Sequence, residues 1–316
     1  MRSLLPLLLA GLALCPVAAK AQDAPPPRAT DASDCPIAPE DEPEWWSAPE
    51  RYAWRQVCAG EVVDMRFATN ADGTRGEDDG AGCRAFTPHE EDPTQLMEPD
   101  DWPATRDLSP RFLRQIAARA PFAEAPAMPA VRIRCAHFSG PLDLRGETIP
   151  QSLWLNDSRL NNGLELSDAR VEGNLSLQGS IAETWPQTLE VPLADLSNDP
   201  TSNPDISVEP EITVIEAPFS GHIGLNWVHV RGNLEMANAW ISEIAAAGAR
   251  IDGVFYANGA TFTDLFYADE MEVGSALLLW DMPSVAAVHL RGARIGGVVM
   301  ADRSTFTGPF IADGME

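Results

Sequence analysis

Residues 248–262 read GARIDGVFYANGATF, and this stretch decides how the second half of the chain folds. Ile251 and Phe262 stand eleven residues apart, and between them Phe255 and Ala257 stand two residues apart. A separation of two residues is the period of a β-strand, so the side chains of Phe255 and Ala257 point to the same face. Each eleven-residue unit therefore predicts one short strand with an apolar side.

Three apolar columns repeat this pattern from Phe138 to the end of the sequence. The second column follows the first by four residues and the third follows by two more, so the unit after Ile241 places Ala245 and Ala247 inside. Gly, Asn, Asp and Ser recur two residues after the first column, and these residue types tolerate tight turns. The first column has fourteen members, thirteen of them apolar: Phe138, Ile149, Leu160, Val171, Ile181, Phe219, Val230, Ile241, Ile251, Phe262, Val273, Ser284, Ile295 and Phe306.

Regular turns between inward-facing apolar columns predict a mainly β fold, a β-solenoid whose stacked coils bury one continuous core. We expect two units, 22 residues, in one coil, because the outward positions alternate in character with that period. A coil of three units is the alternative. The expected solenoid spans residues 131–316 as a right-handed β-helix. It is interrupted at residues 183–217 by an acidic loop insertion with five prolines and no basic residue.

Repeated phrases in this region resemble a known family. Residues 292–297 (GARIGG), 248–253 (GARIDG) and 259–262 (GATF) are similar to the pentapeptide-repeat-like β-solenoids of bacterial proteins. The resemblance covers about residues 131–316, and some relatives of this kind are labelled membrane-associated oxidoreductases. No G-x-G-x-x-G loop follows a predicted strand here, and no ligand set for a cofactor is recognisable, so no cofactor is expected.

The first 21 residues are typical of a signal peptide. Arg2 precedes an apolar run from Leu4 to Ala19, and small residues stand at both positions of an Ala19-Lys20-Ala21 cleavage site. We expect cleavage after Ala21 and a soluble exported protein in the periplasm or the envelope. An uncleaved membrane anchor is the alternative.

Residues 22–130 are expected to form a small, loop-rich cap domain with two short helices. Residues 49–58 predict one helix that stops at Gly60. Ser109 followed by Pro110 predicts the start of a second, with Phe112, Leu113, Ile116 and Ala117 on its apolar face and its end before Pro121.

Four cysteines remain once Cys15 leaves with the signal peptide, namely Cys35, Cys58, Cys83 and Cys135. An even number in an exported chain predicts two disulfides, with three possible pairings. Because Cys135 alone lies at the edge of the repeat region, one bridge is expected to staple an N-terminal cysteine to the solenoid.

Chemistry-bearing residues form no recognisable active site. If the protein were a carbohydrate-active β-helix enzyme, paired carboxylates would be needed, and Asp252, Asp264, Asp269 and Glu270 are the nearest candidates, at turn positions. His222 and His229 could meet across neighbouring turns but have no third metal ligand in sight. Calcium-type oxygen ligands gather at Asn70, Asp72, Glu77, Asp78 and Asp79, but Arg75 stands where an EF-hand loop requires glycine.

The outward position between the second and third columns becomes apolar in the later units. With 22 residues in a coil, Tyr256, Leu278 and Met300 form one external ladder, and Tyr267, His289 and Ile311 form another. Such patches mark a surface for a protein partner, for self-association or for a membrane, unless further chain packs on them. The sequence ends at Glu316 without a polar cap, which favours docking to a partner, a second copy, or a missing C-terminal segment such as a membrane anchor.

The charge excludes one class of partner. With 47 acidic against 22 basic residues the formal charge is −25, so a nucleic-acid binder is not expected. The sequence favours a non-catalytic scaffold or protein-binding surface in the bacterial envelope. The alternative is the carbohydrate-active enzyme.

Overall fold

The computed structural model describes residues 35–86, 102–182 and 221–316. The chain divides into a unit of Met1–Asp31 and a compact unit of Ala32–Glu316. The predicted signal peptide and the acidic insertion at 183–217 lie outside the described residues, so both stay predictions.

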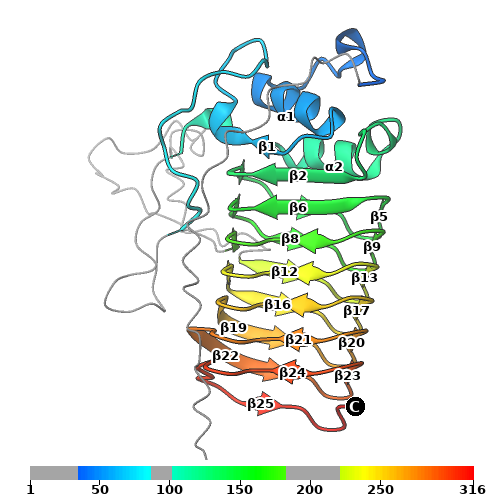
Figure 1. The fold of residues 1–316 in the computed structure, drawn as a ribbon, viewed down its shortest axis with the longest axis vertical. Helices are drawn as coiled ribbons and strands as arrows, with labels where there is room; N and C mark the ends of the chain where they lie inside the picture. Colours follow the sequence, from blue (N-terminus) through cyan, green and yellow to red (C-terminus); the bar gives the residue numbers. More distant parts are fainter. Residues whose placement is uncertain (1–34, 87–101, 183–220) are drawn as a thin grey trace, which may run out of the picture. The chain divides into compact units, whose positions relative to one another are not determined.

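The repeat region is a β-solenoid of parallel strands, as predicted, with its coils stacked beneath the helical N-terminal region (Figure 1). Val131 pairs with Leu153 and Leu153 with Leu175, which fixes a coil of 22 residues. The coil that ends at Phe255 is one residue shorter, since Phe255 pairs with Leu234. Two eleven-residue units therefore make one coil, and the three-unit alternative is wrong.

Three sheets form the walls of the solenoid. The first contains β1 (Val63–Asp64), β2 (Ala130–Arg134), β6 (Ser152–Asn156), β10 (Leu175–Ser176), β14 (Leu234–Glu235), β18 (Phe255–Tyr256), β21 (Leu277–Leu278) and β24 (Val299–Met300). The second contains β3 (His137–Phe138), β4 (Leu142–Asp143), β7 (Arg159–Leu160), β8 (Leu164–Glu165), β11 (Ile181–Ala182), β12 (His222–Gly224), β15 (Trp240–Ile241), β16 (Glu243–Ala245), β19 (Thr261–Tyr267), β22 (Ser284–His289) and β25 (Phe310–Ile311). The third contains β5 (Thr148–Ile149), β9 (Arg170–Val171), β13 (His229–Val230), β17 (Arg250–Ile251), β20 (Glu272–Val273) and β23 (Arg294–Ile295).

The apolar columns fill the interior between these sheets. Leu153, Leu175, Leu234, Phe255 and Leu277 stack in register along the first sheet, and each is fully buried. A single unit could not bury such side chains alone, so the stack of coils is what removes them from water.

The first column is displaced by one residue at Ile181. Ala182 pairs with Ile241 of the next coil and faces the interior, whereas Ile181 pairs with Trp240 on the outside. The repeat pattern favoured Ile181 over Ala182 because isoleucine is the larger apolar residue. The correct spacing from Val171 to Ala182 is the regular eleven residues.

Three later assignments are also wrong by one residue. Val285, not Ser284, pairs with Phe262 and fills the first column, so the one polar member of the predicted column faces outward. In the shortened coil the second and third columns hold fully buried Ile244 and Ala246 instead of Ala245 and Ala247. Neighbouring apolar residues made these assignments ambiguous in the sequence, and strand pairing resolves them.

The predicted turns hold glycine because neighbouring coils touch there. A Cβ atom on Gly173 would lie 2.7 Å from the backbone nitrogen of Ser152, and one on Gly253 would lie 2.7 Å from the carbonyl oxygen of Gly232. A side chain at these positions would push the coils apart.

Each unit contains a second turn that the apolar columns do not reveal. Three residues before the first column the backbone adopts a left-handed conformation, for example at Asp157 (φ 48°) and Asp168 (φ 60°). Glycine fills many of these corners, and the non-glycine ones are Cys135, Asp157, Asp168, Trp227, Asn238, Glu270, Asp281 and Arg303, of which Asp281 stands four residues before Val285.

The N-terminal region covers the first coil. The described part contains two α-helices, α1 (Ala48–Cys58) and α2 (Pro110–Ala118), and the short 3-10 turns η2 (Pro39–Asp41), η3 (Met65–Phe67), η4 (Ala104–Arg106) and η5 (Phe122–Glu124). Neither helix offers an apolar stretch long enough to cross a bilayer, within the described ranges. Strand β1 adds to the edge of the first solenoid sheet through β2.

Both predicted helices form, with the expected glycine stop after α1 and the expected Ser109 cap on α2, while the cap at the start of α1 was not predicted. Ser47 and Glu50 make a capping box at the start of α1, and the left-handed Gly60 (φ 77°) follows its end. The Ser109 hydroxyl accepts a hydrogen bond from the Phe112 amide at 3.1 Å, so α2 begins where Ser-Pro predicted. Glu50 also accepts from the Ser109 hydroxyl, at 2.5 Å, and this contact joins the two helices.

The cysteines pair as two disulfides, Cys35–Cys58 and Cys83–Cys135. The second bridge ties the N-terminal region to the first coil, which confirms the expected staple. The first bridge ties residue 35 to the end of α1.

Candidate functional site

The first predicted ladder runs along the outside of the first sheet. Tyr256 pairs with Leu278 and Leu278 pairs with Met300, so the three side chains stack on successive coils. All three are half-buried. The geometry of this ladder is as predicted.

The second ladder follows the outside of the second sheet. Tyr267 pairs with His289 and His289 with Ile311, on β19, β22 and β25. The rings of Tyr267 and His289 meet edge to face, with centroids 5.9 Å apart. These side chains are half-buried as well. The Phe255 and Phe266 rings meet in the interior, with centroids 5.6 Å apart, so Tyr256 and Tyr267 point away from each other on opposite sides of the coil. We use the name late-coil surface for the two ladders together.

Early coils carry a different outer surface at the same positions. In the second sheet the column contains Asp143, Glu165 and Gly224 before it reaches Tyr267. A Cβ atom at Gly224 would strike the Glu165 carboxylate, so glycine leaves room for that acid. The outer surface of the second sheet therefore changes from acidic to apolar along the stack.

One outer face is covered by the chain itself. Residues 83–86, which we call the strap, and Trp102 pack over Ile181 and Trp240, whose exposed fractions are 1% and 2%. The Arg159 guanidinium lies 4.0 Å from the Trp102 ring centroid, and its Nε donates to the Ala85 carbonyl at 3.0 Å. The apolar outer residues of this face are therefore buried by other parts of the chain. Among the described residues, none covers the late-coil surface in this way.

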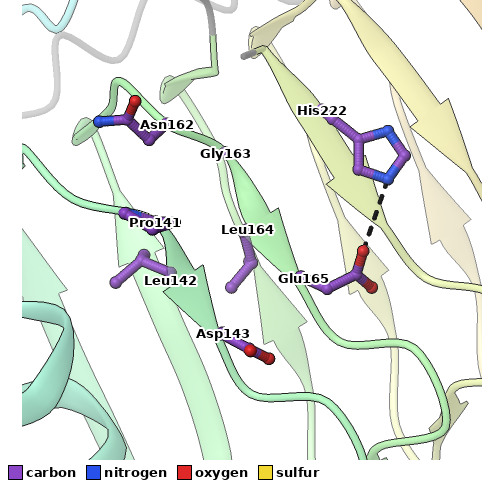
Figure 2. Close-up of a pocket in the computed structure, with 8 residues that line it drawn as sticks. All are labelled: Pro141, Leu142, Asp143, Asn162, Gly163, Leu164, Glu165 and His222. Carbon is purple, nitrogen blue, oxygen red and sulfur yellow. Dashed lines mark ion pairs between the residues drawn. The ribbon is translucent and has the colours of Figure 1, made fainter. Parts of the chain in front are cut away.

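A pocket lies on the acidic part of the second sheet, between neighbouring coils. Figure 2 shows the side chains of Asp143 and Glu165 on adjacent strands, with His222 from the next coil facing Glu165. The His222 ring stands between two carboxylates, with Nε2 3.7 Å from Glu165 and Nδ1 3.7 Å from Glu243. The walls are completed by Pro141, Leu142, Asn162, Gly163 and Leu164.

The two carboxylates of this pocket differ in their partners. Asp143 accepts two hydrogen bonds from the Arg145 guanidinium, and these hold the pKa of Asp143 below its usual value. Glu165 accepts one from the backbone amide of Ser167, at 2.9 Å. A glycan-cleaving site needs a pair of carboxylates, and this pocket, unlike the four predicted residues, brings two acids onto adjacent coils.

The carboxylates singled out from the sequence do not converge. Asp252 accepts hydrogen bonds from His229 and Arg250; burial raises its pKa, but these bonds outweigh burial and leave the pKa low. Asp269 accepts from the Arg291 amide at 2.8 Å, and Glu270 occupies a left-handed corner. Asp264 is exposed within β19, and no contact between two of these four acids is recorded in the described structure.

The two histidines do not meet as expected. His222 lies on β12 in the second sheet and His229 on β13 in the third, within the same coil. His229 donates a hydrogen bond from Nε2 to the Asp252 carboxylate at 3.0 Å, so each histidine has its own acidic partner. Seven residues of one coil separate them around a corner, which spacing alone did not show.

The calcium-type residues at 70–79 are engaged by neighbours. Asp72 accepts from Thr74, and Asp79 forms an ion pair of 2.6 Å with Arg106, whose side chain is fully buried. Nothing in the sequence pattern pointed to Arg106, because its partner lies 27 residues away.

The described residues bring together one group of potential metal ligands, Asp64, Cys83 and Cys135. The two sulfur atoms are bonded to each other, and Asp64 accepts two hydrogen bonds from the Arg66 guanidinium. The group is therefore a disulfide beside an ion pair.

Comparison with protein-family models, with curated proteins and with solved structures gave no match. Function must therefore be inferred from the surfaces described above.

Proposed function

We propose that the protein is an exported, non-catalytic β-solenoid of the pentapeptide-repeat-like kind, which acts as a protein-binding surface in the bacterial envelope. The observation that carries the proposal is the late-coil surface, two ladders of half-buried aromatic and aliphatic side chains, one on the first sheet and one on the second. Apolar patches of this kind on a soluble surface mark contact with another chain.

The charge of the chain favours a different protein over a second copy. At a formal charge of −25, two copies repel each other, whereas a basic partner is attracted by the acidic early coils. The proposed partner contacts the ladders with apolar side chains, and its net positive charge draws it toward this acidic chain.

The disulfides support the exported location. Bonds such as Cys83–Cys135 form and persist in oxidising compartments and are rare in the cytosol. A cell fractionation tests this part separately: the mature chain is expected in the periplasmic or envelope fraction, with its N-terminus after Ala21. Recovery of uncleaved chain from the cytosol would contradict export.

Photo-crosslinking in the native cell tests the surface. A photoreactive residue placed at Leu278 or His289 is expected to give one discrete adduct with another protein. The matched controls are Glu235 and Glu165, which occupy the same two columns in earlier coils. Equal adducts at the control positions would contradict the proposal, and so would an adduct of two copies of this chain.

A second candidate function is the carbohydrate-active enzyme, favoured by the pocket that holds Asp143 and Glu165 on adjacent coils. It predicts turnover of an oligosaccharide library by the purified protein and loss of turnover in Asp143→Asn and Glu165→Gln variants. Absence of turnover across the library would leave the binding role alone.

A further inference from the structure

A hollow on the third sheet belongs to neither function proposed above. It lies at the corner that leads into that sheet, and its lining comes from four successive coils: Trp227, Gly248, Arg250, Glu270, Glu272, Gly292 and Arg294. The late-coil surface lies on the other two sheets, so the inference below does not depend on it.

The aromatic side chain in this hollow is exposed. Trp227 leaves 60% of its surface to solvent, more than any other large apolar residue in the described ranges. Its ring lies against the backbone at Gly248, where any Cβ atom would strike it. One face of the indole is thereby held in place, and the rest of the side chain is offered to solvent.

The backbone at Trp227 is an unfavourable place for a tryptophan. Its φ of 59° belongs to the left-handed corner series, which is filled by glycine at Gly146, Gly248 and Gly292 in the same column. A bulky residue with this φ is uncommon and costs free energy in the folded state. Since the side chain buries little and the corner prefers glycine, the fold gains nothing obvious from Trp227, which points to a role in binding.

The positive and negative charges of the side chains beside the Trp227 ring cancel. Glu272 bridges two guanidinium groups, 3.4 Å from Arg250 and 3.1 Å from Arg294. With Glu270 at the corner, the lining holds two acids and two bases, so its formal charge is zero. These planar groups offer hydrogen-bond donors and acceptors in pairs without attracting an ion.

We infer that this hollow is a binding site for a neutral oligosaccharide. The apolar face of a sugar ring stacks on the Trp227 indole, and adjacent hydroxyls bind in pairs to the carboxylate and guanidinium groups of Arg250 and Glu272. Coils about 4.8 Å apart repeat these groups at nearly the spacing of successive rings in an extended β-linked glycan. An anionic glycan is disfavoured by the charge of −25 on the whole chain.

Calorimetric titration of the purified, disulfide-bonded protein with cellotetraose and with tetra-N-acetylchitotetraose tests the site. At least one of these neutral probes is expected to bind, and Trp227→Gly is expected to weaken binding by about tenfold or more. Because glycine suits the corner, this variant should fold as well as the parent, as judged by its melting curve. The matched control is Trp280→Ala, which removes an indole that is 36% exposed at another position and should leave binding unchanged.

Two further measurements sharpen the test. Glu270→Gln, an exposed change, should weaken binding less than Trp227→Gly and should not alter the fold. Because the ligand is neutral, raising the salt concentration should change its affinity by no more than about twofold. The inference is overturned if neither probe binds, if Trp227→Gly binds as tightly as the parent, or if Trp280→Ala loses as much affinity.

Discussion

Leu277 and Leu278 are neighbours in β21 that the structure places on opposite sides of the wall, and their replacement by alanine gives the sharpest stability test. Leu277 is fully buried between Phe255 and Val299, whereas Leu278 is half-buried on the outer surface. Truncating a buried leucine removes its transfer free energy and leaves a cavity, which costs about 2–5 kcal/mol. Truncating the outer leucine removes only part of the transfer term, about 1 kcal/mol or less.

The two variants are compared by urea unfolding with the disulfides intact, followed by far-ultraviolet circular dichroism. Since the coils of a solenoid can unfold separately, hydrogen exchange at β18, β21 and β24 is measured in parallel. Leu277→Ala is expected to lower the unfolding midpoint and to speed exchange in these strands, while Leu278→Ala stays close to the parent. Equal losses in the two variants, or a larger loss for Leu278→Ala, would refute the inward and outward assignment.

Three more outcomes follow from the structure. Asp79→Asn leaves the fully buried Arg106 guanidinium without its charged partner and is expected to cost about 3–5 kcal/mol of unfolding free energy. Burial raises the pKa of Asp79, but the hydrogen bonds from Arg106 outweigh it and keep the pKa below 3.8. The ion pair therefore contributes its full stability above the pKa that Asp79 has in the unfolded chain, and this stability is lost as pH falls through the lower pKa of the folded state. The stability of Asp79→Asn should accordingly decline less steeply in acid than that of the parent. An unchanged acid profile would argue against the pair. Replacing both Cys83 and Cys135 by Ser removes a disulfide between residues 52 positions apart. In the chain-entropy account this should lower the free energy of unfolding by about 4 kcal/mol, measured under non-reducing conditions beside the parent. An unchanged free energy of unfolding would contradict the role of this disulfide as a staple. Gly274→Ala drives a methyl group into the backbone of the preceding coil, and its melting temperature should fall clearly, whereas an unchanged value would count against the close approach of the coils.

The repeat spacing was enough to predict the coil and both outer ladders. A 22-residue period places Tyr256, Leu278 and Met300 in one column wherever the chain winds regularly, and the strand pairing agrees. The capping residues Ser109 and Pro110 predicted α2 for a local reason, the need to satisfy free amide groups.

The features that the sequence did not reveal depend on contacts between distant segments. The first column was assigned to Ile181 instead of Ala182 because Ile181 is also apolar. Its side chain is apolar because it packs on the outside, beneath the strap. His222 reaches Glu165 only because the strand after residues 183–220 takes the next place in the stack. Outward acids 22 residues apart, Asp143 and Glu165, were the available signal for the pocket, and they were visible in the column itself.

The account depends most on the stack resuming in register after residues 183–220, because this sets which side chains share an outer face. Arg170 of β9 is paired with His229 of β13 across that gap, and Arg250 lies one coil further along the same column. With cysteines at 170 and 229, the Cα atoms stand about 4.8 Å apart, within reach of a disulfide, while a pair at 170 and 250 is separated by roughly twice that distance. Mild oxidation and peptide mass spectrometry under non-reducing conditions should find the 170–229 bridge and no 170–250 bridge. A bridge at 170–250, or none at 170–229, would contradict the stacked coils described here.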